Sequence, residues 1–221
     1  MTVTICALLW SNPGSDEQLH SKLAESLSTV VASYGGTPVS LYRRKEGSIG
    51  PLEVLTMRWP SHEVLDDYRA STDALHAASS GTDEISNMVI CYEEPVRSSV
   101  VTNANFHAAR RPGTKPVTIC VLVWSHSGQD LLLSAYADRA LANAESYGAR
   151  ILQRLRRQRG SAGPLETQII EFPSEQLCEE YRQAQRGDEY EHIRNTAIAN
   201  WLVFPVESVL ELATPSLQPS L

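Results

Sequence analysis

The heptapeptide GSIGPLE occupies residues 47–53, and GSAGPLE occupies residues 160–166. The surrounding sequence repeats with them, because residues 34–69 align with residues 147–182 without a gap. Similarity that recurs at a fixed separation is typical of a chain built from repeated structural units. The sequence therefore predicts a tandem duplication.

Both copies predict the same order of secondary-structure elements. Each opens with an apolar run too short for a helix, VTICALLWS at residues 3–11 and VTICVLVWS at residues 117–125, which predicts a strand. In the first copy, Ser15 and Gln18 form the pattern of a capping box at the start of a helix. Two short strands around the heptapeptide, a second helix with Ser61 as N-cap, and a last strand follow. We therefore predict a βαββαβ unit in each copy, the ferredoxin-like arrangement.

The heptapeptide could be a loop that cradles a ligand or a structural turn. A phosphate cradle needs a helix N-terminus after its glycines, whereas residues with strand character follow here. Counting back across the turn places Arg43 opposite Glu53 and Arg156 opposite Glu166, and such a pair contributes about 0.2–1 kcal/mol. We predict a hairpin turn in which the glycines supply the backbone angles.

The composition excludes several classes of protein. A formal net charge of −7 and a pI near 5.4 are unlike the basic face of a nucleic-acid-binding protein. No apolar run reaches the length of a membrane span, and the first residues lack the basic flank of a signal peptide. The four cysteines show no CxxC or metal-ligand spacing, so we expect reduced core residues. We predict a cytoplasmic protein without a nucleic-acid or membrane partner.

One group of motifs carries a resemblance to a known superfamily. The motifs of the second copy are Ile170-Glu171-Phe172-Pro173-Ser174, Tyr181-Arg182, Glu189-Tyr190 and Arg194. They resemble the dimeric α/β-barrel superfamily, which includes antibiotic-biosynthesis monooxygenases, EthD-like and NIPSNAP-like proteins. The first copy keeps Trp59-Pro60-Ser61 and Tyr68-Arg69, and then diverges from Ser71 to His76.

The resemblance implies an α+β fold in which two such units close a barrel around a cavity. Because this chain carries two tandem units, the barrel is expected to be an intramolecular pseudo-dimer, so that the protein is a monomer or a weak homo-oligomer. The expected boundaries are residues 1–95 for the first repeat, 96–116 for a linker, 117–213 for the second repeat and 214–221 for a flexible tail.

Strand alternation selects the first candidate site residues. If Trp59 and Phe172 pack under the helices, Arg58 and Glu171 point to the other face, into the expected barrel. They occupy equivalent positions with opposite charge. They could form a salt bridge with each other, or serve in anion binding or acid–base chemistry.

Other candidates come from aromatic residues and histidines. Trp10, Trp124 and Tyr42 could close the core or line a flat ligand, and Thr56 lies on the same strand face as Arg58. His126 follows the strand that contains Trp124, and His76 replaces the glutamate of the second copy. Either histidine could be a surface residue or a general base near pH 7.

The six histidines show no HxH or HxxxH spacing, so the sequence gives no support for a metal site. Haem, which some barrel relatives bind, would need an axial ligand that the sequence does not place.

Two functions remain open. The first is an enzyme without a tightly bound cofactor that oxygenates, cyclises or isomerises a largely apolar, aromatic metabolite of antibiotic or polyketide type in the barrel cavity. The second is a non-catalytic binding or assembly module, because a fold alone does not confer an activity.

Overall fold

The computed structural model of the chain describes residues 2–27, 31–78, 84–96 and 104–209. Within these ranges it describes all side chains except those of residues 72–78, 95, 104, 105 and 188–190. The predicted tail at 214–221 and part of the predicted linker, residues 97–103, lie outside the description.

The first half of the chain has the predicted element order. Its elements are β1 (Val3–Ser11), α1 (Asp16–Ser26), β2 (Thr37–Arg44), β3 (Glu53–Trp59), α2 (His62–Ala78) and β4 (Ile85–Pro95).

The second half keeps this order but adds two helices. Its elements are α3 (Ala104–Ala109), β5 (Val117–Ser125), α4 (Asp130–Ser146), β6 (Arg150–Arg157), β7 (Glu166–Phe172), α5 (Glu175–Ala184), α6 (Asp188–Ala197) and β8 (Ile198–Ser208). α3 lies within the predicted linker, and the second helix of the repeat is divided into α5 and α6. The break falls next to Gly187, the N-cap of α6, whose backbone is extended.

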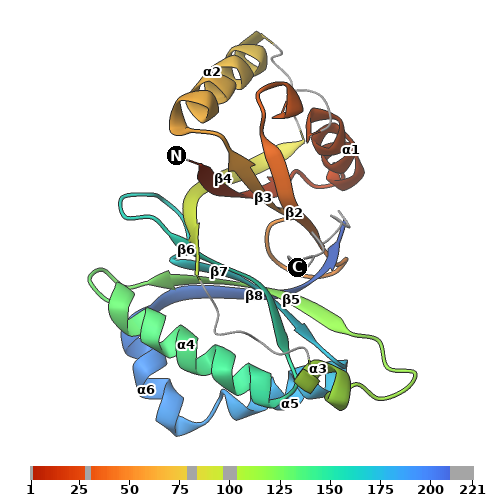
Figure 1. Cartoon of the computed structure of the whole chain (residues 1–221), viewed down its shortest axis with the longest axis vertical. Helices are drawn as coiled ribbons and strands as arrows, with labels where there is room; N and C mark the ends of the chain where they lie inside the picture. Colours follow the sequence, from red (N-terminus) through yellow and green to blue (C-terminus); the bar gives the residue numbers. More distant parts are fainter. Residues whose placement is uncertain (1, 28–30, 79–83, 97–103, 210–221) are drawn as a thin grey trace, which may run out of the picture. The chain divides into compact units, whose positions relative to one another are not determined.

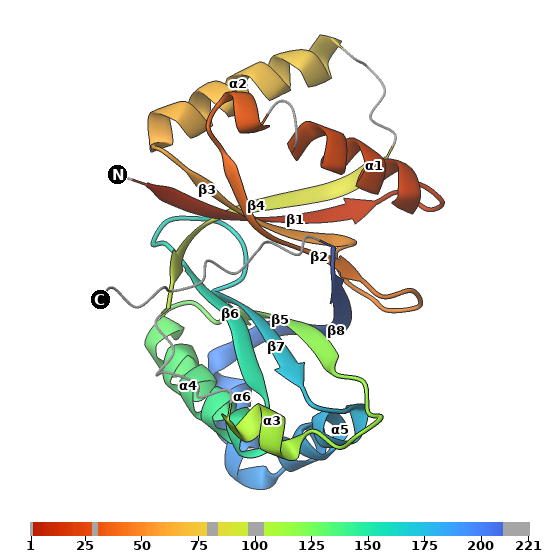
Figure 2. The same cartoon turned by 45° about the vertical axis from the view of Figure 1, so that its right-hand side comes forward.

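The chain divides into two compact units. Unit 1 consists of residues 1–43, 51–88 and 207–221, and unit 2 consists of residues 44–50 and 89–206. In unit 1 the strand order is β1-β3-β2, and in unit 2 it is β8-β5-β7-β6-β4, with every neighbouring pair antiparallel. Within each unit the helices cover one face of the strands (Figures 1 and 2). Closure of all strands into one intramolecular barrel stays a prediction, as does the duplication.

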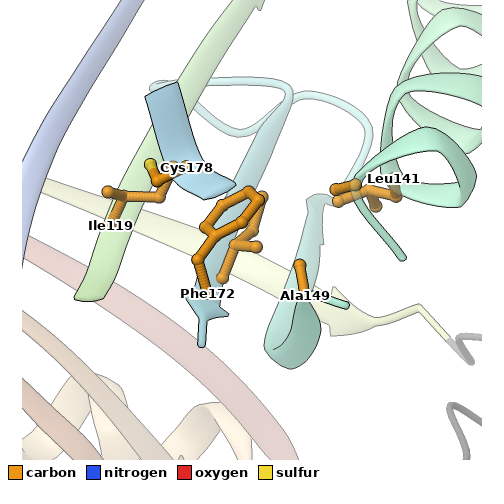
Figure 3. Packing of buried hydrophobic residues seen from close by; sticks show 7 residues of the cluster. Ile119, Leu141, Ala149, Phe172 and Cys178 are labelled. Carbon is orange, nitrogen blue, oxygen red and sulfur yellow. The ribbon is translucent and has the colours of Figure 1, made fainter. Parts of the chain in front are cut away.

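The core of unit 2 lies between this sheet face and the helices. Phe172 is fully buried, and Cys178 of α5 and Leu141 of α4 belong to the same apolar cluster. Figure 3 shows the ring of Phe172 beside Ile119 and Cys178. In unit 1, Trp59 takes the corresponding place and its ring lies 4.7 Å from that of Tyr68. The predicted strand alternation at these two residues is therefore confirmed.

The two hairpins have the same internal bonds. Arg44 donates from Nη1 to the Gly50 carbonyl at 2.9 Å, and Arg157 donates to the Gly163 carbonyl at 3.0 Å. Gly50 and Gly163 have φ values of 143° and 101°, which glycine adopts without strain. Both heptapeptides are therefore turns, as predicted.

The register of the predicted Arg–Glu pairs is also correct, since Arg43 pairs with Glu53 and Arg156 with Glu166. The environment of both glutamates, however, is the protein interior. Both glutamates have 0% exposed area, and each receives hydrogen bonds from further side chains. The value for an exposed cross-strand pair therefore does not apply to them.

The helix starts agree with the prediction only in part. Ser61 and Ser174 accept hydrogen bonds from backbone N–H groups three residues later, as N-caps do. The capping box at Ser15 is wrong, because its side chain makes no capping bond. The hydroxyl of Ser11 instead donates to Asp16, the first residue of α1, and Ser125 donates in the same way to Asp130.

The four cysteines are free and buried, as predicted. None of the described helices combines the length and the apolar character needed to cross a membrane.

Candidate functional site

Arg58 and Glu171 lie on the strand face opposite the helices of their own units. Arg58 is exposed. Glu171 is half-buried and accepts a hydrogen bond from Nε of Arg150, which is opposite it on β6. The guanidinium of Arg150 lies 4.4 Å from the ring centre of Phe106 of α3. Glu171 therefore has a cationic partner in its own hairpin, and the roles predicted for these two residues stay predictions.

The other predicted site residues differ in how deeply they are buried. Tyr42 and Thr56 are buried, whereas Trp10 and Trp124 are half-buried. His126 is exposed, and its backbone N–H donates to the Ala197 carbonyl.

His76 lies on α2, and its side chain is outside the described part. None of the seven predicted site residues whose side chains are described lines the pocket that the structure shows in unit 2.

This pocket has a volume of about 450 Å³ and lies between the sheet and the helices of unit 2. Its apolar wall comes from β5, β7, β8 and α4. The wall residues are Ile119, Val121, Val123, Leu133, Ala137, Ala140, Ile170, Ile198, Trp201 and Val203. Such a wall arises because alternate residues of each strand face the helices. Size and lining are those of a site for a small organic molecule.

Trp201 adds a flat aromatic surface to the pocket. Its side chain is 51% exposed although it lines the cavity. An indole ring in this position can stack against a planar ligand that enters from solvent.

A few polar groups converge on this apolar space. Gln185 is the C-cap of α5, and both its Oε1 and Nε2 are buried without a partner among the described residues. A buried amide that makes no hydrogen bond costs about 1–3 kcal/mol per polar group. A ligand that carries a hydrogen-bonding oxygen would remove this cost.

Two further polar residues of the pocket already form hydrogen bonds within the protein. The hydroxyl of Tyr181 donates to the Ala140 carbonyl at 3.3 Å and thereby joins α5 to α4 across the pocket. Gln168 donates to the buried carboxylate of Glu166 at 2.8 Å. These contacts hold the walls in place, and Gln185 is the lining amide whose polar atoms have no partner among the described residues.

Tyr136 of α4 and three arginines complete the lining, and the arginines are Arg182 of α5, Arg186 just after α5, and Arg194 of α6. Arg194 donates from Nη1 to the Gln185 carbonyl at 3.1 Å, so it fixes the end of α5. Arg182 lies 3.8 Å from Glu179, with both side chains partly exposed. At that distance the ion pair is weak, and it is the ion pair that the described side chains give Arg182.

The described residues give no support for a metal centre, and the three commonest types of axial haem ligand are absent from the described lining of the pocket. No histidine, cysteine or methionine is among the described residues that line the pocket. Elsewhere in the described part, no group of three or more histidine, cysteine, aspartate and glutamate side chains converges on one point.

The pocket residues could have been found by a comparison of the two copies. Gln185 and Arg186 align with Thr72 and Asp73, so an amide and a positive charge are present in one copy alone. Tyr181, Arg182 and Arg194 belong to the motif that carries the superfamily resemblance. We assigned that motif to the fold, whereas it also supplies part of the pocket wall.

Solved structures resemble this chain along almost its whole length, although no family model and no curated protein matches it. A protein described as anthrone oxidase-like is 16% identical, and the match covers 95% of this chain and 91% of that one with a TM-score of 0.62. A mutant chlorite dismutase from Candidatus Nitrospira defluvii is 10% identical over 93% of this chain and 90% of its own, with a TM-score of 0.53. Both are dimeric α/β-barrel proteins, so the predicted resemblance is confirmed at the level of the fold.

Proposed function

We propose that this protein is an oxidase-type enzyme that holds a flat, largely apolar, enolisable ketone in the pocket of unit 2. The amide of Gln185 supports this proposal most directly, because it is buried without a partner among the described residues and belongs to a residue that lines an apolar cavity. The half-exposed ring of Trp201 suits a planar ligand, and the similarity to an anthrone oxidase-like protein agrees with a tricyclic aromatic ketone.

In the proposed reaction the substrate loses a proton from the methylene carbon to hydroxide or a buffer base at the pocket mouth. Its electrons are delocalised onto the ketone oxygen, and Nε2 of Gln185 donates a hydrogen bond to this enolate. Dioxygen then accepts the electrons and forms a C–O bond at the former methylene, and the peroxide anion takes back the proton from the conjugate acid of that base. The resulting hydroperoxide loses water and leaves a new carbonyl, so one oxygen atom enters the product and the other leaves as water.

The protein's part in this reaction is to orient the substrate, exclude water and stabilise the enolate. A donor placed at the developing negative charge of an oxyanion contributes roughly 10²–10³ to the rate in other enzymes. No tightly bound cofactor is required, because the substrate enolate itself supplies the electrons to dioxygen.

The test is oxidation of anthrone in air, followed by oxygen uptake and by quinone formation. Gln185→Leu should reduce kcat/KM at least about tenfold, since it removes the donor to the enolate. Gln183→Leu is the matched control, because Gln183 is exposed on the same helix and its side chain bonds Glu179. An equal effect of both substitutions would refute the role of Gln185, and no oxidation above the uncatalysed rate would refute the proposal.

A non-catalytic binding module is the second candidate. No aspartate, glutamate or histidine is among the described lining residues, so the pocket provides no evident general base. Binding of anthrone or its quinone without turnover would favour this alternative.

Several finer proposals accompany this one. We propose that the chain arose by tandem duplication, that its two repeats form one intramolecular barrel, and that it acts in the cytoplasm in a pathway of specialised metabolism. A monomer in analytical ultracentrifugation would support the intramolecular barrel, whereas a dimer that does not dissociate on dilution would contradict it.

A further inference from the structure

The arginines of the pocket point to a more specific substrate than a neutral aromatic ketone. Arg182 and Arg186 are four residues apart at the end of α5, and Arg194 comes from α6. Three arginines therefore line one cavity in a protein whose formal net charge is −7. A local reversal of the overall charge attracts anionic ligands.

Among the described side chains, the contacts of these arginines occupy few of their donors. A guanidinium has five N–H donors, and Arg194 uses one of its nitrogens on the Gln185 carbonyl. Arg182 has one distant ion-pair partner, Glu179 at 3.8 Å. For Arg186 the described side chains provide no ion pair within 4 Å. The pocket thus has spare donors in the fork geometry that binds a carboxylate through two parallel hydrogen bonds.

We infer that the substrate is an aromatic ketone with a carboxylate substituent, and that Arg182, Arg186 and Arg194 bind this carboxylate while the apolar wall holds the rings. This inference rests on the proposed function, since it uses the same pocket. It assigns the arginines to substrate selection, whereas Gln185 is assigned to the enolate oxygen at the reacting end.

The second copy alone contains this arrangement. Arg186 aligns with Asp73 and Arg194 aligns with Gly81, so only Arg182 has an arginine counterpart, Arg69. A substitution in the aligned positions of unit 1 therefore gives a control that leaves the proposed carboxylate site intact.

Binding of three probe compounds tests the inference: anthraquinone, anthraquinone-2-carboxylate and anthraquinone-2-sulfonate. Affinity is measured by calorimetry and by quenching of tryptophan fluorescence in wild type, in Arg182→Gln/Arg186→Gln and in the control Arg69→Gln. Each titration is repeated at low and high salt. The wild type should bind the carboxylate at least about tenfold more tightly than anthraquinone, corresponding to one charge-assisted interaction.

The double substitution should remove this preference and its salt dependence without changing the affinity for anthraquinone. Arg69→Gln should change neither. Stronger binding of the sulfonate than of the carboxylate would overturn the assignment to a carboxylate, because it would show general attraction of anions. Equal affinity for the neutral and anionic probes would overturn the inference and leave the proposed function standing.

Arginine-dependent binding of the carboxylate without any oxidation of anthrone or its carboxylate would do the reverse. It would refute the proposed oxidase and retain the ligand class. Failure of all three probes to bind would overturn both.

Discussion

Arg154 binds both carboxylate oxygens of Glu166, through Nε to Oε2 and through Nη2 to Oε1, each at 2.9 Å. Arg156 and Gln168 donate to the same carboxylate, and all of these groups lie on β6 and β7. Glu166 is completely buried and Arg154 nearly so. Glu53 of unit 1 has the same sequence context with fewer partners, Arg43 and His20, and its Oε2 is without a hydrogen bond.

The first prediction compares the conservative substitution at these two positions. Glu166→Gln places an amide N–H₂ against arginine and glutamine donors, so it should lower the free energy of unfolding by about 3 kcal/mol, as breaking a buried ion pair does. Glu53→Gln should cost less than about 1 kcal/mol. Burial raises the pKa of Glu53 despite Arg43 and His20, and the new N–H₂ can occupy the place of the unpartnered oxygen.

Urea unfolding monitored by circular dichroism gives both values. Equal losses at the two positions would contradict the role assigned to Arg154, because this arginine has no counterpart in unit 1, where Leu41 occupies the aligned position.

The sequence was sufficient for the order of the elements and for the hairpins. Repetition located the two copies, and the Gly-Pro pattern followed by a strand identified the turns. It was insufficient for the burial of Glu53 and Glu166, since alternation on a strand gives the face of a residue but not the depth of what covers it. It also missed α3, a six-residue helix in a stretch whose composition is that of a linker.

The position of the pocket differs from that of the site predicted from the sequence. Strand alternation predicts a site at charged residues on the strand face away from the helices, here Arg58 and Glu171. The pocket lies on the other face, where the strands contribute apolar residues that look like core. Its polar groups come from the end of α5 and from α6, and the position of that helix break depends on tertiary packing that no pattern in the sequence specifies.

A second prediction concerns the tight turn of the second hairpin. A Cβ at Gly163 would lie 2.2 Å from Sγ of the buried Cys91, and φ is 101° there. Gly163→Ala should therefore lower the free energy of unfolding by about 1–2 kcal/mol because alanine is strained at this backbone angle. Overpacking against Cys91 should lower it further, by about 1–3 kcal/mol. Gly160→Ala, with φ of 88° and open space around the new Cβ, should show the first cost alone.

Thermal unfolding separates the two contributions. In the Gly163→Ala background, Cys91→Ala should recover part of the loss, because it removes the atom that the new methyl group meets. Absence of any recovery would show that backbone strain alone accounts for the effect.

The third prediction is a dependence of stability on pH that originates at Glu93. This residue of β4 is 1% exposed and accepts from the hydroxyl of Thr167, while its Oε2 has no partner. Burial raises the pKa of Glu93 from its usual 4.5 to about 8. Between these values the folded protein binds more protons than the unfolded chain, so stability should fall as pH rises from about 4.5 to 8 and be independent of this group above that range.

Melting temperatures from pH 5 to pH 9 test this for wild type, Glu93→Gln and Glu94→Gln. Glu93→Gln should flatten the slope and stabilise the protein most above pH 8, since the neutral amide does not ionise. Glu94 is exposed, and its substitution should leave the slope unchanged. A wild-type slope that persists in Glu93→Gln would assign the proton uptake to another group.

The last prediction asks whether ligands occupy the pocket of unit 2 or the strand face that contains Arg58. Ala140 of α4 is half-buried and lines the pocket, so Ala140→Leu places a larger side chain in its open space. Leucine has nearly the helix propensity of alanine, and the substitution should leave the melting temperature almost unchanged. It should weaken the binding of anthraquinone-2-carboxylate at least about tenfold, because the rings lose room and contacts that are worth more than 1.4 kcal/mol. Ala135→Leu, on an exposed position of the same helix, should bind like wild type. If Ala140→Leu binds anthraquinone-2-carboxylate normally and Arg58→Ala does not, the ligand site is the strand face predicted from the sequence. The pocket beneath α4 and α5 would then be a cavity without a ligand-binding role.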